Sequence, residues 1–110
     1  MRRVVTPPRI FLRVVLRSLE RDARVGELVP IVVRVDSDAE TRLTLRFDSA
    51  AFELVAGSPD VSVGAGSHDV EWGVYVRNAA VGERTIDVLA RRDQLVQMAT
   101  MVVRVHVDDE

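Results

Sequence analysis

Few residues in this chain could do catalytic chemistry, and the first group is Ser67, His68 and Asp69. They are adjacent, and adjacent side chains of a strand point to opposite faces. They therefore cannot form the hydrogen-bonded triad of a hydrolase. The other histidine, His106, stands alone, and the sequence has no glycine-rich phosphate loop and no HExxH spacing. The chain is predicted not to be an enzyme, and no cofactor is expected.

Metal chemistry has little support in the residue types. The chain has no cysteine and two separate histidines, which argues against a zinc site or a disulfide framework. Calcium prefers oxygen ligands, and carboxylates could converge if the loops around residues 36–40, 64–69 and 91–94 meet at one end. These candidates are Asp36, Asp38, Glu40, Asp69 and Asp93. Aspartate also stabilises turns locally, and Arg91 and Arg92 oppose a cation, so no metal is predicted and calcium is kept as an alternative.

Length and composition describe one ordinary domain. The chain has 110 residues, of which 47% are hydrophobic, and this suffices for a single core. Its net charge of −2 argues against a sequence-independent grip on nucleic acid. The longest apolar run, Leu28 to Val33, is far shorter than the roughly 20 residues of a membrane-spanning helix. Neither a nucleic-acid partner nor membrane insertion is predicted.

The N-terminal residues do not have the sequence pattern of an export signal. Arg2 and Arg3 resemble the basic start of a signal peptide, but Arg9, Arg13 and Arg17 interrupt the apolar stretch that must follow. The chain is expected to be cytoplasmic as written, or a module of a longer exported protein.

Alternation of apolar and polar residues is the dominant pattern. It is clearest over residues 41–47, 69–77 and 101–107, and it is typical of strands with one buried face. Trp72 alternates with charged residues and is expected in the core. The best helical segment, Leu16 to Arg24, is short. The expected strands lie near residues 9–17, 29–35, 41–47, 51–55, 61–63, 69–77, 84–90 and 95–107.

Turn-forming clusters divide the chain every 8–12 residues, as in two-sheet sandwiches. The fold class predicted is all-β, a two-sheet antiparallel immunoglobulin-like sandwich of seven or eight strands. Residues 1–8 are expected to be a flexible lead-in, and residues 9–107 the sandwich. Pro30 lacks a backbone donor, so regular pairing is expected from Ile31. Ala99 and Thr100 interrupt the last alternation and predict a bulge.

The order of turns and strands along the chain resembles that of a known group of protein modules. It consists of Val25-Gly26-Glu27, then Val63-Gly64-Ala65-Gly66, Val70-Glu71-Trp72 and the run Gly82-Glu83-Arg84-Thr85-Ile86-Asp87-Val88. Taken together over residues 9–107, this order is similar to bacterial immunoglobulin-like modules of the cell-adhesion-related (CARDB) type. The resemblance implies a fold and no activity.

Apolar residues on both faces of the first two strands are the most informative anomaly. If the alternate residues that include Leu12 and Ile31 point inward, the apolar residues between them point outward. The outward set is Phe11, Val15, Leu28 and Val32, and its rim consists of Arg13, Arg17 and Arg34. If the two strands are neighbours, this set forms an exposed patch of the kind that marks protein interfaces. A single exposed valine or leucine is ordinary, so the alternative is that the patch has no function.

The uneven distribution of charge along the chain indicates a partner whose surface is itself charged. Residues 1–24 carry an excess of five positive charges, and the remainder carries an excess of seven negative ones. The N-terminal edge could therefore meet an acidic surface, including that of a second copy. The function predicted is a non-catalytic protein-interaction or structural module, with a protein partner or self-association. Two alternatives remain open: a carbohydrate- or calcium-binding module that uses the loops at one end, and a self-assembling arrestin-like or virion-type structural protein.

Overall fold

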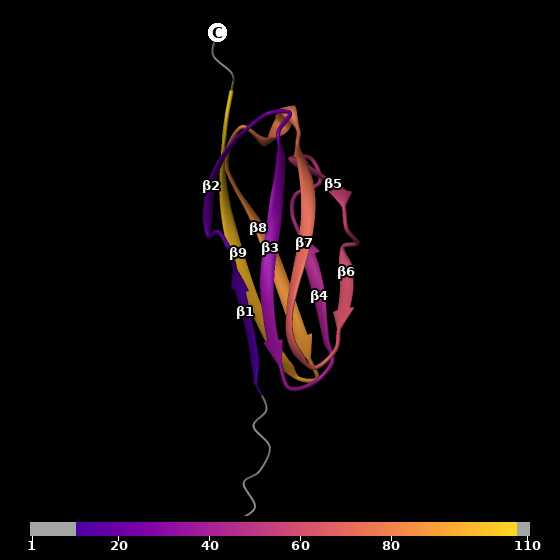
Figure 1. Cartoon of the computed structure of the whole chain (residues 1–110). Helices are drawn as coiled ribbons and strands as arrows, with labels where there is room; N and C mark the ends of the chain where they lie inside the picture. The colour runs from indigo at the N-terminus through magenta and orange to yellow at the C-terminus, as the bar shows by residue number, and fades with distance from the viewer. Residues whose placement is uncertain (1–10, 108–110) are drawn as a thin grey trace, which may run out of the picture.

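Two β-sheets packed face to face form the molecule in the computed structural model, which describes residues 11–107 except the side chain of residue 79. The four-stranded sheet has the order β1-β3-β7-β5, and the five-stranded sheet has the order β2-β9-β8-β4-β6. In Figure 1 the four-stranded sheet lies toward the viewer. The strands are β1 (Leu12–Leu16), β2 (Glu20–Arg24), β3 (Leu28–Ser37), β4 (Thr41–Arg46), β5 (Phe52–Ala56), β6 (Asp60–Val63), β7 (Gly66–Val76), β8 (Gly82–Arg92) and β9 (Leu95–His106). The predicted all-β sandwich is confirmed.

One turn of 3₁₀ helix, η1 (Asn78–Ala80), joins β7 to β8. The described residues contain no helix with the length and apolarity needed to cross a membrane. The expected lead-in, residues 1–8, lies outside the described residues.

The strand that the alternation did not predict is β2. Its sequence, Glu-Arg-Asp-Ala-Arg, buries only Ala23 and therefore shows no apolar period. It is held by parallel pairing with β9, from Glu20 opposite Val102 to Arg24 opposite His106. Because the two strands are far apart in the sequence, no local sequence pattern predicts this pairing.

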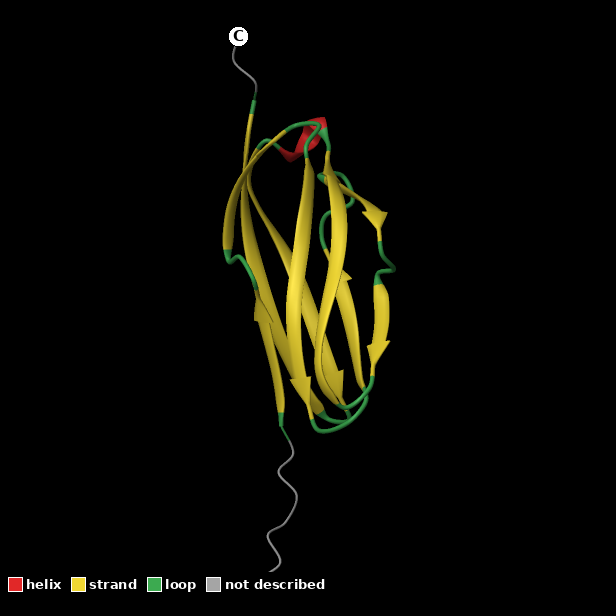
Figure 2. Ribbon diagram, viewed as in Figure 1, coloured by secondary structure: helices red, strands yellow, loops and turns green. Residues whose placement is uncertain are grey.

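Both lateral edges of the sandwich are built by a segment that changes sheets. At one edge the chain passes from β1 to β2 through residues 17–19, and at the other it passes from β5 to β6 through residues 57–59 (Figure 2). Each of these four edge strands has five residues or fewer. Short edge strands limit uncontrolled pairing between chains, so the open faces of the sheets become the surfaces available for contact.

The position of Pro30 follows from this change of sheets. Pairing of β3 with β7 already begins at Leu28, earlier than the Ile31 predicted. The carbonyl of Val32 accepts a hydrogen bond from the Arg17 N–H at 2.9 Å, and backbone groups two residues apart on a strand point to the same side. The missing N–H of Pro30 would therefore point to the edge of β3 that β1 covers further along. Because β1 has already ended at this point, no hydrogen bond between strands is lost.

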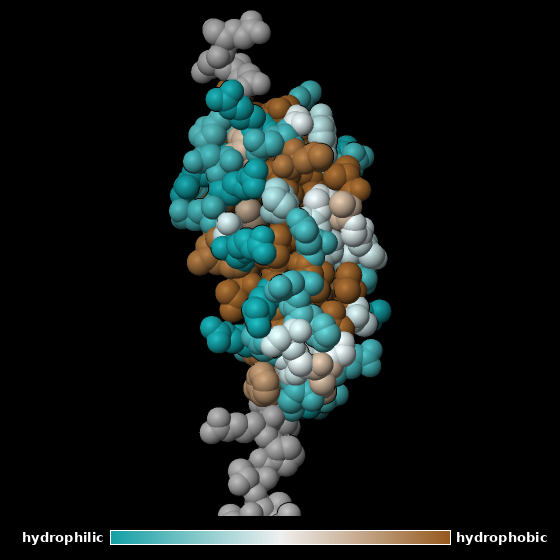
Figure 3. All heavy atoms as spheres, in the orientation of Figure 1, coloured by the Kyte–Doolittle hydropathy of each residue, from teal (hydrophilic) through white to brown (hydrophobic). Residues whose placement is uncertain are grey.

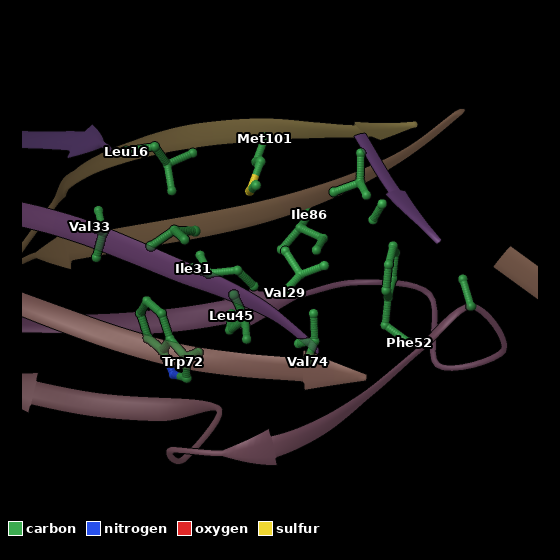
Figure 4. Packing of buried hydrophobic residues seen from close by; sticks show 14 of the residues in the cluster. Leu16, Val29, Ile31, Val33, Leu45, Phe52, Trp72, Val74, Ile86 and Met101 are labelled. Atoms are coloured by element: carbon green, nitrogen blue, oxygen red, sulfur yellow. The ribbon is translucent and has the colours of Figure 1, made fainter. Parts of the chain in front are cut away.

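The core lies between the sheets and is drawn from their alternating residues, as predicted. Trp72, Phe52 and Ile31 are its largest fully buried side chains, and Figure 4 shows Trp72 beside the β3 residues. From β3 the core takes Val29, Ile31, Val33 and Val35, each at most 1% exposed. Full burial of such a side chain contributes about 1.5–3 kcal/mol. The core thus fixes which residues of β1, β3 and β7 point to solvent.

The bulge predicted at Ala99 and Thr100 is wrong. Pairing between β8 and β9 runs without interruption there, with Thr100 opposite Asp87. The register instead shifts between Leu54 and Ala56 in the pairing of β5 with β7, immediately before the chain leaves this sheet. An irregularity at that point bends the edge strand away from β7.

Candidate functional site

The outer face of the four-stranded sheet holds most of the predicted interface residues. β1 pairs with β3, as the interface prediction required, with Val15 opposite Arg34. Val32 lies opposite Glu71 on β7. An open hollow on this face, which we call the central hollow, is lined by Arg13, Val15, Arg17, Val32, Arg34, Asp36 and Asp69. The register therefore brings together five of the seven predicted residues.

The other two predicted residues, Phe11 and Leu28, lie toward opposite ends of the sheet. The Phe11 N–H points to Asp38 Oδ1, at 3.3 Å, beside the turn that follows β3. Leu28, at the start of β3, lies opposite Tyr75. At about 3.3 Å per residue, the ten residues of β3 separate these positions by roughly 30 Å. Figure 3 shows apolar residues across this face with hydrophilic ones between them, so the apolar surface is divided. Val15 and Val32 are the two apolar residues that line the central hollow.

The charges around the central hollow are ordered across the strands. On β3, Arg34 lies 3.8 Å from Asp36, which also accepts a hydrogen bond from the Ser67 hydroxyl. Within the part of the chain that the structure describes, Arg13 and Arg17 make no ion pair, nor does Glu71. Unpaired arginines of β1 and an unpaired carboxylate of β7 thus flank the apolar centre on opposite sides.

The loops named as a calcium candidate do gather at one end, where β3, β6 and β8 finish (Figure 1). Arginine neutralises three of their carboxylates, one of them through the contact of Arg34 with Asp36. Arg92 Nη2 donates to Asp38 at 3.0 Å, and Nη1 donates to Asp93 at 2.8 Å. Among the described residues, no group of three metal-ligating side chains forms, so the five carboxylates, including Asp36, Glu40 and Asp69, do not converge.

The contact of Arg92 with Asp38 is expected to stabilise this end of the sandwich. Arg92 Nε lies 2.7 Å from Asp38 Oδ1, and the side chains are 12% and 20% exposed. We expect Asp38→Asn to lower the free energy of unfolding by about 1–3 kcal/mol, because it removes the less exposed of the two carboxylates that pair with a mostly buried guanidinium and leaves only the exposed Asp93. Urea denaturation measures this loss. The matched control is Asp93→Asn, since Asp93 contacts the same guanidinium from a side chain 79% exposed. Equal losses in the two variants would contradict this account.

The Ser67-His68-Asp69 group has the geometry expected of a strand. Ser67 and Asp69 are exposed, whereas His68 is half-buried, and its buried Nε2 has no hydrogen-bond partner among the described residues. The second histidine lies elsewhere, with His106 Nε2 3.2 Å from Asp22. This arrangement brings no nucleophile and base together.

Two features of the molecular surface were not predicted from the sequence. Glu71 was not singled out because its place beside Val32 depends on the register between β3 and β7. The outer face of the five-stranded sheet was also missed, although Arg42 and Arg46 alternate visibly on β4. Only the pairing of β4 with β8 shows that Arg42 lies directly opposite Arg91.

Comparison with known proteins relates the chain to β-sandwich domains. No protein-family model matches the sequence, and a search of curated proteins finds no match. A Caenorhabditis elegans member of the MSP family, WR4, is similar in structure with a TM-score of 0.63 at 7% identity, covering 84% of this chain and 97% of that one. The BIgI domain of the Streptococcus agalactiae beta protein, solved bound to CEACAM1, has a TM-score of 0.56 at 15% identity, with 90% and 100% covered.

An enzyme structure also contains a similar domain. The chain resembles part of a GH5 xyloglucanase from Bacteroides ovatus, with a TM-score of 0.57 and 16% identity, over 89% of this chain and 19% of the enzyme. At these identities the likeness shows the fold alone. The fold is an immunoglobulin-like and MSP-like two-sheet sandwich, and such sandwiches carry many functions.

Proposed function

We propose that this chain is a non-catalytic protein-interaction module that acts through the outer face of β1, β3 and β7. The partner that this face fits best is a second copy of the chain. The similarity to the BIgI domain, which was solved bound to a protein, supports a binding role for such a sandwich. The finer resemblance to CARDB-type modules is part of this proposal and rests on the turn and strand punctuation of the sequence.

One row of residues carries the proposal. Arg17, immediately after β1, Val32 on β3 and Glu71 on β7 lie side by side, because Val32 is opposite Glu71 and its carbonyl accepts the Arg17 N–H. A two-fold axis parallel to β3 and above Val32 would bring each Val32 against its copy. The same axis would bring each Arg17 against the partner's Glu71, because β1 and β7 flank β3 on opposite sides. The row is therefore complementary to itself.

The remaining contacts of such a dimer are compatible with this row. By the same axis Val15, 42% exposed, would lie against the partner's Asp69, because Val15, Arg34 and Asp69 form the next row. The apolar contribution, about 1.5–3 kcal/mol for each fully covered side chain, therefore comes from the two Val32 side chains. Arg34 would face its own copy, but Asp36 at 3.8 Å neutralises it. Exposed ion pairs contribute at most about 1 kcal/mol each. We therefore expect a reversible dimer with a Kd in about the micromolar range.

Charge reversal tests this arrangement. Arg17→Glu should abolish the dimer, since the new carboxylate meets the partner's Glu71, and Glu71→Arg should do the same. The double variant, Arg17→Glu with Glu71→Arg, should restore the dimer because the charges are exchanged. Sedimentation equilibrium of the full chain, from about 1 µM to about 1 mM, measures the association around the expected Kd.

The control for this series is Arg42→Glu, which reverses an exposed arginine on the other sheet. It should leave the dimer unchanged. Circular dichroism and a melting curve check that every variant is folded. A monomeric wild type, or a double variant that stays as monomeric as the single ones, would rule out self-association through this row.

A further inference from the structure

The outer face of the five-stranded sheet is a second surface whose charges the fold leaves unpaired. We call it the arginine face, and it is formed by β4, β8 and β9. Its members are Arg42, Arg46, Leu89, Arg91, Val96 and Met98. It lies on the opposite side of the sandwich from the central hollow, so what it binds is independent of self-association.

Two like charges face each other at the centre of this surface. Arg42 lies directly opposite Arg91 in the pairing of β4 with β8, and both side chains are exposed. Like charges in this position repel and destabilise a sheet. Their row continues to Ser62 on one side and Val96 on the other, neither of which offers a carboxylate. In the described part of the chain, neither arginine makes an ion pair.

The acidic residues nearby are bonded to hydroxyl groups. Asp60 accepts a hydrogen bond from the Thr44 hydroxyl at 2.9 Å. Asp87, which lies opposite Arg46 in the register, accepts one from the Thr100 hydroxyl at 2.7 Å. Arg46 likewise makes no ion pair among the described residues. The three arginines of this face are therefore available to an external anion.

Exposed apolar side chains lie beside these arginines. Val96 is 50% exposed and lies opposite Arg91, and Met98 is 61% exposed and lies opposite Leu89. Leu89 and Val96 line a small hollow together with the three arginines of the face and the hydrogen-bonded pair of Thr44 and Asp60. A cationic strip on β4 and β8 thus borders an apolar strip on β8 and β9.

We propose that the arginine face binds an acidic, extended peptide segment of a partner protein. A carboxylate of the segment would lie between the guanidinium groups of Arg42 and Arg91 and would relieve the repulsion between them. The planar guanidinium group can also donate two parallel hydrogen bonds to one carboxylate. An apolar side chain two residues further along the segment lies on the same side as this carboxylate and would cover Val96 and Met98. A nucleic acid fits less well, because the described strands β4, β8 and β9 contain no phenylalanine, tyrosine or tryptophan for base stacking and the chain has a net charge of −2.

A defined synthetic peptide tests this proposal without an identified partner. The probe is a fluorescently labelled peptide with the repeat Glu-Ser-Val-Ser, which places Glu and Val on the same side of an extended chain. It is titrated with the full chain and followed by anisotropy. Binding should weaken as salt is added, and the double variant Arg42→Gln with Arg91→Gln should bind about tenfold more weakly or worse. Arg77→Gln, an exposed arginine that follows β7 on the other sheet, is the control and should bind as the wild type does.

A stability measurement separates a binding role from a structural one. Arg91→Glu should raise Tm by about 2–5 °C, because it replaces repulsion of Arg42 with attraction, and should abolish peptide binding. If the two arginines served only the fold, this substitution would not improve it. The proposal is overturned by any of three results: a double variant that binds like the wild type, equal binding of a peptide with Gln in place of Glu, or tighter binding of a single-stranded oligonucleotide.

Discussion

Trp72→Ala is expected to lower the free energy of unfolding by about 3–5 kcal/mol, a large part of the stability of a domain of this size. The indole is fully buried, and its Nε1–H donates to the carbonyl of Ser58 at 2.6 Å. Gly57, with φ at +89°, lies against it, and a Cβ at that position would come within 2.9 Å of the Trp72 ring. Removing the indole therefore opens a cavity and leaves the carbonyl without this partner.

The matched control for Trp72→Ala is Tyr75→Ala, an outward-facing aromatic on the same strand that is 38% exposed. We expect its loss to be about 1 kcal/mol, because its ring is partly exposed and its removal leaves no enclosed cavity. Urea denaturation should be followed by circular dichroism, since Trp72 is the only tryptophan of the chain. Equal losses for the two variants would contradict the assignment of β7 faces.

A second large effect is expected from two adjacent positions on β3. Val33→Arg should leave the domain unfolded at neutral pH, because Val33 is fully buried and an unpaired charge there loses its hydration. Val32→Arg should leave it folded, since Val32 faces outward and lies opposite Glu71, which can pair with the new cation. The same Val32→Arg variant should be monomeric, because the two new cations would meet on the proposed two-fold axis.

Melting curves and sedimentation of these two variants give separate answers. A folded Val33→Arg variant would show that the inward and outward residues of β3 are misassigned. A folded, dimeric Val32→Arg variant would leave the fold intact and exclude Val32 from the interface. The pair therefore distinguishes an error in the register from an error in the proposed function.

The fold could be predicted because most strands carry a local signal. Residues such as Leu43, Trp72 and Val103 alternate with polar ones, and this period alone indicates which side is buried. β2 could not be predicted in this way. It is polar and edge-lying, with Ala23 as its one buried residue, and its pairing partner β9 lies about eighty residues further along the chain.

The candidate site was predictable in part for a related reason. Alternation indicates that Val15 and Val32 share a face with Phe11 and Leu28, but it says nothing about how far one strand slides along the next. The register that pairs Leu16 with Val33 leaves Leu28 five residues beyond the end of β1. For the same reason, the approach of Arg42 to Arg91 is not visible in the sequence.

Cross-linking through a single introduced cysteine tests the central claim most directly, because the natural chain contains no cysteine. If copies associate through the row that contains Val32, the Val32→Cys variant should be joined into a dimer by a short bismaleimide. Val96→Cys, at a half-exposed position on the other sheet, should react with the reagent without being joined covalently to a second chain. Cross-linking of Val96→Cys as efficiently as Val32→Cys, or of neither, would contradict self-association through the outer face of β1, β3 and β7.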